Sequence, residues 1–167
     1  ITVVSQTKTQ MVVQMPATDA ERVAFKMTNA SGTSVSQLDV VNVNKALTVY
    51  SDQYDNSFQN WGWGGDYNGS TTADKISGAN SMVAAFDPNG AWGGLQIGNG
   101  NLNVSGKKYF SFWVKGADTD KQVQATLNWG AWKVITIPAN KWTHFEYTMN
   151  TDFAGVGTVN TVIFQMF

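Results

Sequence analysis

Cysteine is absent from the 167 residues, and histidine occurs once, as His144. The lack of cysteine excludes disulfide frameworks, thiol catalysis and cysteine-ligated zinc. With a single histidine, the chain has few of the residues that a Ser/His/Asp triad or a histidine-rich metal site requires. The side chains that most often carry nucleophilic and metal chemistry are therefore scarce in this chain.

Charge is also scarce, because charged residues make up 14% of the chain against about 25% in an average soluble domain. The net charge is −1 and the lysines are scattered, so there is no basic patch of the kind that binds nucleic acids or anionic membranes. No apolar run reaches the ~18–20 residues of a membrane span. We therefore expect no nucleic acid partner and no membrane span, and a polar surface built from Asn, Gln, Ser and Thr.

Glutamate occurs only as Glu21 and Glu146. A glycosidase typically needs two carboxylates flanking the scissile bond, one of them with a raised pKa. The aspartates fall mostly in turns, where turn chemistry accounts for them. We expect a protein that is not an enzyme, with Glu146 and Asp66 as the pair to test for lyase or hydrolase activity.

Short alternating segments dominate what is present, and 43% hydrophobic residues are sufficient for a packed core. Residues 2–15 predict one or two strands that end at Pro16, and residues 23–43 predict a hairpin with a turn at 29–32. From residue 46 onward, alternating segments are separated by Gly, Asn and Asp, with no useful stripe at helical spacing. The sequence predicts an all-β fold closed as a two-sheet sandwich.

The first segment carries one resemblance. VVSQTKTQMVVQMPA followed by VAFKMTNASGTS resembles the second half of an IPT/TIG immunoglobulin-like domain, in which such a turn precedes the last strand. The resemblance implies a partial immunoglobulin-like β element over residues 1–45. Because the chain starts at Ile1 without a methionine, we expect a processed piece or an excerpt of a larger multidomain protein.

A second resemblance covers residues 46–167. VYSD, NWGWGG, SGANSMVAAF, WGGLQI, YFSFWVKG and IPANKWTHFEY occur in that order, and the ordered set resembles β-jelly-roll carbohydrate-binding modules, which are appended to bacterial polysaccharide hydrolases or carried by surface glycan-binding proteins. It implies a jelly-roll sandwich, a polysaccharide partner and an extracellular or cell-surface bacterial location. It also implies a structural calcium ion as an option, with Asp52 and Asp55 as ligands, and no other cofactor.

Exposed tryptophans are the natural sugar-binding candidates, because an indole can cover the apolar face of a pyranose while amides bind its hydroxyls. Trp61 and Trp63 are two residues apart and share one face of a strand, with glycines around them that cannot cover them. Trp92 lies in a similar glycine-flanked loop. Trp142 follows a turn and is expected to anchor a strand end.

Alternation along the later strands extends the candidate site. It places Phe110, Phe112 and Val114 inward and Trp113 outward, and it turns a series of amides outward. We expect one sheet to carry Trp113 and these amides on its outer face, with a plain solvated face as the alternative. The predicted ligand-binding residues are Trp61, Trp63, Trp92, Trp113, Gln96, Gln124, Asn128 and Asp66, and a second tier comprises Trp129, Trp132 and Gln165.

The sequence therefore predicts non-catalytic binding of a neutral polysaccharide, with an extended β-1,4-linked plant glycan such as glucan, xyloglucan or mannan as the expected ligand. Such binding would target a parent hydrolase or surface protein to its substrate. The alternative is a structural spacer or protein-interaction sandwich, because aromatic enrichment is equally typical of protein interfaces.

Overall fold

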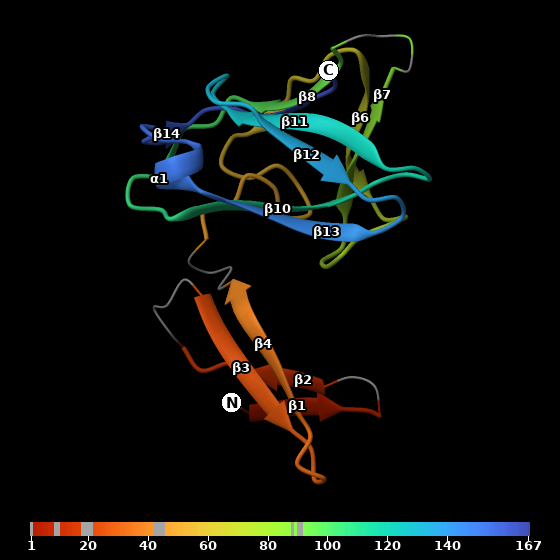
Figure 1. Cartoon of the computed structure of the whole chain (residues 1–167), viewed down its shortest axis with the longest axis vertical. Helices are drawn as coiled ribbons and strands as arrows, with labels where there is room; N and C mark the ends of the chain where they lie inside the picture. Colours follow the sequence, from red (N-terminus) through yellow and green to blue (C-terminus); the bar gives the residue numbers. More distant parts are fainter. Residues whose placement is uncertain (1, 9–10, 18–21, 42–45, 88, 90–91) are drawn as a thin grey trace. The chain divides into compact units, whose positions relative to one another are not determined.

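The computed structural model describes the chain apart from residues 1, 9–10, 18–21, 42–45, 88 and 90–91 and apart from the side chains at 22, 25 and 35–41. It divides into two compact units, Ile1–Leu47 and Thr48–Phe167, which Figure 1 colours from red to orange and from yellow to blue. The division falls after residue 47, whereas the sequence predicted a boundary after residue 45.

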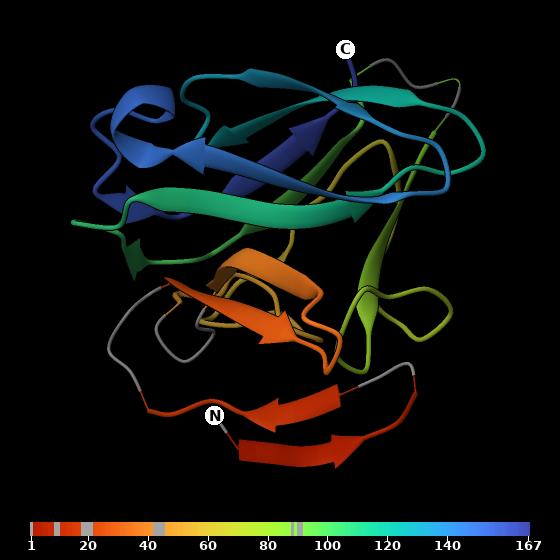
Figure 2. The same ribbon diagram turned by 60° about the horizontal axis from the view of Figure 1, so that its bottom comes forward.

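The first unit consists of two antiparallel pairs of strands. β1 (Thr2–Gln6) pairs with β2 (Met11–Gln14), and β3 (Arg22–Thr28) pairs with β4 (Ser34–Val41). Figure 2 shows the red pair and the orange pair. The predicted strands and hairpin of this unit are thus confirmed.

The turn between β3 and β4 is held by Asn29. Its carbonyl accepts a hydrogen bond from the Gly32 N–H at 3.0 Å, and its Oδ1 accepts from the backbone N–H groups of Ser31 at 3.1 Å and Thr33 at 2.9 Å. Gly32 has φ 82°, a left-handed conformation that glycine adopts without steric cost. The predicted turn is confirmed, and asparagine at its start supplies the side-chain acceptor typical of such turns.

One layer of the second unit is a five-stranded antiparallel sheet. Apolar side chains alternate along its strands and turn to one face, where Ile97, Val123 and Val162 are buried. In spatial order its strands are β12 (Lys133–Ile137), β11 (Lys121–Leu127), β15 (Val162–Gln165), β8 (Gly94–Gly98) and β5 (Gln59–Asn60).

The opposite layer is the antiparallel pair β10 (Tyr109–Lys115) and β13 (Trp142–Thr148), with Phe112 directly opposite Phe145. Phe112 also meets Phe164 of the five-stranded sheet edge to face, with ring centroids 4.8 Å apart. Figure 1 shows β11 and β12 in one layer and β10 and β13 in the other. Aromatic rings from both layers therefore fill the space between them.

Smaller elements close the unit. β6 (Gly65–Thr71) pairs with β7 (Ser81–Phe86), and β9 (Leu102–Asn103) pairs with β14 (Thr158–Val159). The short helix α1 (Met149–Asp152) buries Met149 in the core. The regular secondary structure of the described residues is nearly all β, because α1 is its one short helix. The predicted all-β sandwich is confirmed.

Candidate functional site

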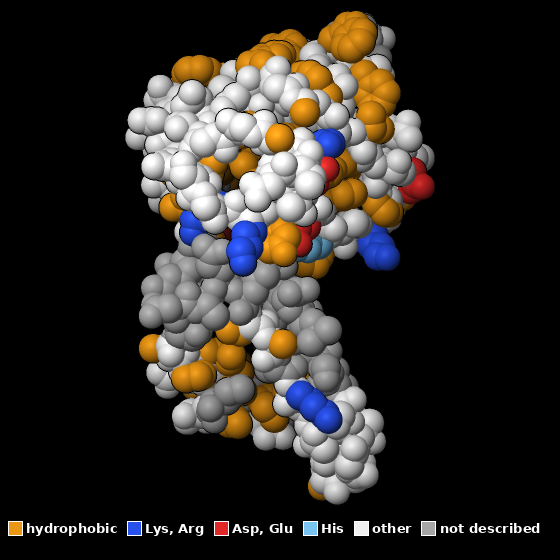
Figure 3. All heavy atoms as spheres, turned by 60° about the vertical axis from the view of Figure 1, so that its left-hand side comes forward, with side chains coloured by type: hydrophobic (Ala, Val, Ile, Leu, Met, Phe, Trp, Pro, Cys, Tyr) orange, Lys and Arg blue, Asp and Glu red, His pale blue; other side chains and the backbone are white. Residues whose placement is uncertain are grey.

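The outer face of the five-stranded sheet carries no charged side chain at any of its outward positions. The strand register places Val134, Gln124, Gln165 and Gly94 in one row across four strands. In Figure 3, orange side chains lie along the top of the larger unit, on the side where Figure 1 places β8 and β11, and the blue and red side chains lie lower. The outward positions are Gln59, Gly94, Gln96, Gly98, Gln122, Gln124, Thr126, Val134, Thr136, Ile163 and Gln165.

Trp61 and Trp63 continue the edge strand β5 alongside β8. The Trp61 N–H donates to the Gln96 carbonyl at 2.8 Å, and Trp63 exchanges backbone hydrogen bonds with Gly94, both at 2.9 Å. The two tryptophans therefore lie on the same face of the sheet, as their spacing predicts. Trp61 is 48% exposed and Trp63 is half-buried.

Glycines of the neighbouring strand receive both indoles. A Cβ built on Gly94 would meet the outer edge of the Trp63 six-membered ring, and a Cβ on Gly98 would meet the Trp61 ring. Glycine at these positions leaves room for each indole to lie directly on β8, an arrangement in which aromatic rings cover strand glycines. The sequence reasoning treated nearby glycines only as residues unable to cover the rings and missed this complementary pair.

Trp129 and Trp132 join the same face. Trp63 and Trp129 are stacked, with ring centroids 5.6 Å apart and an interplanar angle of 24°, and Trp132 meets Trp129 edge to face at 6.0 Å. Because Trp63 lies on β8 and Trp129 follows β11, the two rings meet above β15, which lies between those strands. We call the outer face with Trp61, Trp63, Trp129 and Trp132 the aromatic face.

Two outward residues beneath this cluster are fully buried, although they face away from the core. Thr126 and Ile163 lie directly opposite each other on β11 and β15, and each has 0% exposure. Alternation along β11 turns Thr126 away from the core, so its full burial needs a cover on the outer face. The stacked rings of Trp63 and Trp129 lie on this same outer face, between β8 and the end of β11.

A series of hydrogen bonds ties the amides to the indoles. The Trp92 carbonyl accepts from Trp63 Nε1 at 2.7 Å and from Gln165 Nε2 at 3.3 Å, and Gln165 Oε1 accepts from Gln124 Nε2 at 3.1 Å. Trp92 has φ 70°, a conformation uncommon for a bulky residue. The residue is 57% exposed, and its carbonyl accepts the hydrogen bond from the Trp63 indole. Gln96 projects from the same face and is half-buried.

Asn128 has a structural task that the sequence reasoning did not foresee. Its Oδ1 accepts from the backbone N–H groups of Asn160 at 2.8 Å and Thr161 at 3.1 Å, and its Nδ2 donates to the Thr158 carbonyl at 2.6 Å. These three hydrogen bonds fasten the turn after β11 to the neighbouring chain, and they engage the amide that the sequence predicts as a ligand for sugar hydroxyls.

The prediction that Trp113 shares a face with the outward amides is wrong. Trp113 lies on β10, in the opposite layer of the sandwich, and its ring stacks on His144 with centroids 4.9 Å apart. Asp66 lies on β6 opposite Ala85, also outside the five-stranded sheet. Period-two alternation gave the outward direction of Trp113 correctly, but it cannot tell which sheet a strand joins.

Asp52 and Asp55, the predicted calcium ligands, are engaged in loop closure. Asp52 Oδ1 accepts from the backbone N–H groups of Ala79 at 2.8 Å and Asn80 at 2.9 Å, and these bonds hold the pKa of this carboxyl below its usual value. Asp55 Oδ2 accepts from the Ser51 hydroxyl at 2.6 Å. No group of three or more His, Cys, Asp or Glu side chains gathers as a metal site among the described residues, and the assignment of Asp52 and Asp55 to a calcium site stays a prediction.

Two other residues singled out from the sequence, Trp142 and Glu146, lie away from the aromatic face. The Trp142 indole N–H donates to Asp74 at 3.2 Å, which fits the predicted anchoring of a strand end. The Lys115 ammonium and then this indole keep the pKa of Asp74 below its usual value. Glu146 lies on β13 opposite Ser111, so it and Asp66 belong to different sheets.

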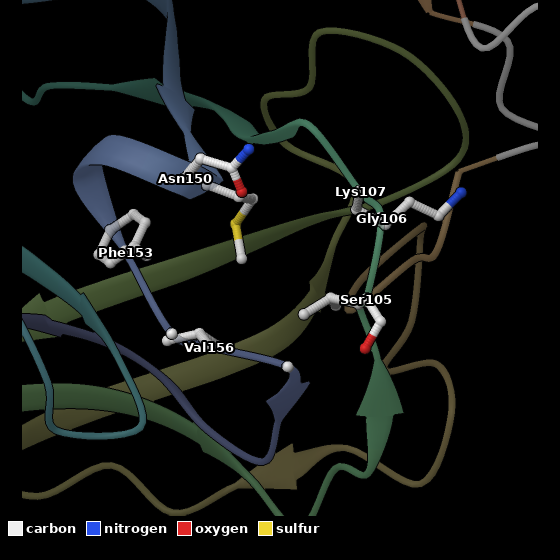
Figure 4. A pocket seen from close by; sticks show the side chains of 10 residues that line it. Ser105, Gly106, Lys107, Asn150, Phe153 and Val156 are labelled. Carbon is white, nitrogen blue, oxygen red and sulfur yellow. The ribbon is translucent and has the colours of Figure 1, made fainter.

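A hollow of about 270 Å³ lies at the end of the unit near α1. Figure 4 shows Asn150, Phe153 and Val156 on one side of it and Ser105 on the other, with the Lys107 side chain directed away. Phe153 is buried in the core. None of the predicted ligand-binding residues lines this hollow.

No protein-family model matches the chain, and no curated protein matches it. In the part of the chain that the structure describes, no helix has the length and apolar character needed to cross a membrane.

Proposed function

We propose that the second unit binds a neutral polysaccharide on the aromatic face and has no catalytic role. The observation that carries the proposal is the gathering of four tryptophans on one uncharged, amide-bearing sheet face. Two of these residues, Trp61 at 48% and Trp129 at 52%, remain about half exposed. Large aromatic side chains left in water on one face typically mark an interaction surface.

The chemistry of the face suits a carbohydrate. An indole offers a flat apolar surface to the C–H groups of a pyranose, and Gln96 and the Gln124 and Gln165 pair offer donors and acceptors to its hydroxyls. The lack of charge favours a neutral polysaccharide over a uronate-rich one. Affinity per sugar is expected to be weak, because hydroxyls exchange water bonds for protein bonds with little net gain.

An extended chain such as a β-1,4-linked glucan, xyloglucan or mannan fits a site that crosses several strands. The aromatic cluster runs from Trp132, next to β12, to Trp61, next to β8. Neighbouring strands are about 4.8 Å apart, so this surface is longer than one sugar ring. We further propose that the unit is secreted or displayed at a bacterial cell surface, where it would target a parent protein to its substrate.

Affinity electrophoresis of the full chain tests the proposal against hydroxyethyl cellulose, xyloglucan, galactomannan and xylan. Trp61→Ala should reduce retardation by about tenfold in association constant, the equivalent of one lost stacking contact with its buried area. Trp113→Ala is the matched control, because Trp113 is 50% exposed but lies in the opposite layer.

Retardation by one polysaccharide that is weakened by Trp61→Ala and unaffected by Trp113→Ala would support the proposal. Equal effects of the two variants would place the site elsewhere. A folded protein that none of the polysaccharides retards would favour the alternative, a spacer or protein-interaction sandwich, which self-association in sedimentation experiments would then reveal.

A further inference from the structure

The indole of Trp63 is largely occupied by the protein itself. The outer edge of its six-membered ring lies over Gly94, its face is stacked on Trp129, and its N–H donates to the Trp92 carbonyl at 2.7 Å. A tryptophan side chain has one hydrogen-bond donor, so none is left for a ligand. Trp63 is therefore placed to support another ring.

The residue that Trp63 supports lies in a tight turn. The Gly130 N–H donates to the Leu127 carbonyl at 2.9 Å, and the two residues between them, Asn128 and Trp129, have φ 53° and 59°. Two successive left-handed residues define a type I′ turn, in which glycine is the preferred second residue. A tryptophan at this position is a strained choice, because its Cβ approaches the backbone.

The turn is also anchored so that it cannot relax. The Asn128 side chain makes hydrogen bonds to the backbone of Thr158, Asn160 and Thr161, and its own N–H donates to the Thr161 carbonyl at 3.0 Å. Strained backbone held by its surroundings is concentrated at functional sites. In this turn the strained backbone holds one aromatic ring at the surface. Trp129 contacts Trp63 and Trp132 and remains 52% exposed.

We infer that Trp129 is the principal sugar-stacking residue and that Trp63 is a positioning residue, which holds the Trp129 ring and does not itself contact the sugar. This inference rests on the proposed polysaccharide-binding function. It reverses the order given by sequence reasoning, which ranked Trp63 as a contact residue and Trp129 in the second tier.

The first test measures affinity with full-length variants. Trp129→Gly keeps the turn geometry, because glycine is the preferred residue there, and it should lower the association constant for the retarding polysaccharide by about tenfold or more. Trp63→Ala should also weaken binding, whereas Trp63→Phe should restore it, since a phenyl ring can still stack on Trp129. Unchanged affinity in Trp129→Gly would overturn the inference.

The second test locates the contact directly by oxidation with N-bromosuccinimide and peptide mass spectrometry, with and without the same polysaccharide. Bound polysaccharide should protect Trp129 and leave the slower reaction of Trp63 unchanged, and Trp113 should react equally in both samples. Protection of Trp63 with Trp129 unprotected would reverse the assignment.

The two proposals fail in different ways. If the unaltered protein is retarded by a polysaccharide but Trp129→Gly binds equally well, the inference fails and the proposed function stands. If the unaltered, folded protein is retarded by none of the four polysaccharides, both fail together.

Discussion

The strained turn at Trp129 leads to a prediction about stability. Replacing Trp129 by alanine removes two ring contacts of about 0.5–1.5 kcal/mol each but keeps a Cβ in the left-handed region. Replacing it by glycine removes the same contacts and also relieves about 1–2 kcal/mol of strain, against which glycine loses about 0.5–1 kcal/mol more backbone entropy than alanine on folding. Trp129→Gly should therefore be more stable than Trp129→Ala by about 1 kcal/mol, the net of these terms.

Urea unfolding monitored by tryptophan fluorescence measures this difference, and all seven tryptophans lie in the second unit. The two variants should differ in midpoint and share the same slope. Trp132 provides the control, because it belongs to the same cluster and is not among the residues with positive φ. Trp132→Gly should be less stable than Trp132→Ala. If alanine were the more stable replacement at 129 as well, the strain argument would be refuted.

Three further changes test other parts of the unit. Gly98→Ala should displace the Trp61 ring, which would shift the Trp61 NMR signal and weaken polysaccharide retardation. Gly157→Ala is the control, because its Cβ would make only an ordinary contact at 3.6 Å and should leave the tryptophan NMR signals unchanged. An undisturbed Trp61 signal in Gly98→Ala would contradict the packing. Asn128→Ala should lower the free energy of unfolding by about 2 kcal/mol, because two backbone donors and one acceptor lose their partner, and an unchanged urea midpoint would count against this anchoring. The pKa of Asp52 is lowered in the folded state by the backbone N–H groups of Asn80 and Ala79. Its contribution to the free energy of unfolding is therefore present above pH about 4 and is lost as the pH falls through the folded pKa. Asp52→Asn should reduce the acid sensitivity of the thermal midpoint, and equal sensitivity in the variant and the unaltered protein would argue against this linkage.

The inward and outward directions of side chains were predictable because alternation is a local property. Leu95 and Ile97 of β8 turn inward and Gln96 outward, as period-two spacing requires. The same reasoning worked for Gln165 of β15. For Trp113 it gave the outward direction but not the sheet, because membership of a sheet depends on pairing between distant segments.

The fit between the tryptophan rings and the glycines of the neighbouring strand could not be predicted from the sequence either. Gly94 and Gly98 are four residues apart in one segment, and the indoles that they receive lie in another. Trp129 reaches the aromatic face because it lies in a turn with positive φ. The residues that favour such turns are Gly, Asn and Asp, so the sequence does not predict a tryptophan there. The paired signal of glycines four residues apart on one face of a strand and tryptophans two residues apart in another segment is the one that could have identified the site.

Because the Trp61 ring lies over Gly98, the side chain at each of these two positions limits the size that the other can have. A larger residue at 98 would be accepted only together with a smaller one at 61, so substitutions at these positions should occur in pairs and show strong coupling in a double-mutant cycle. Transfer of the aromatic face to another β-sandwich would accordingly require the receiving glycines to be moved along with the tryptophans.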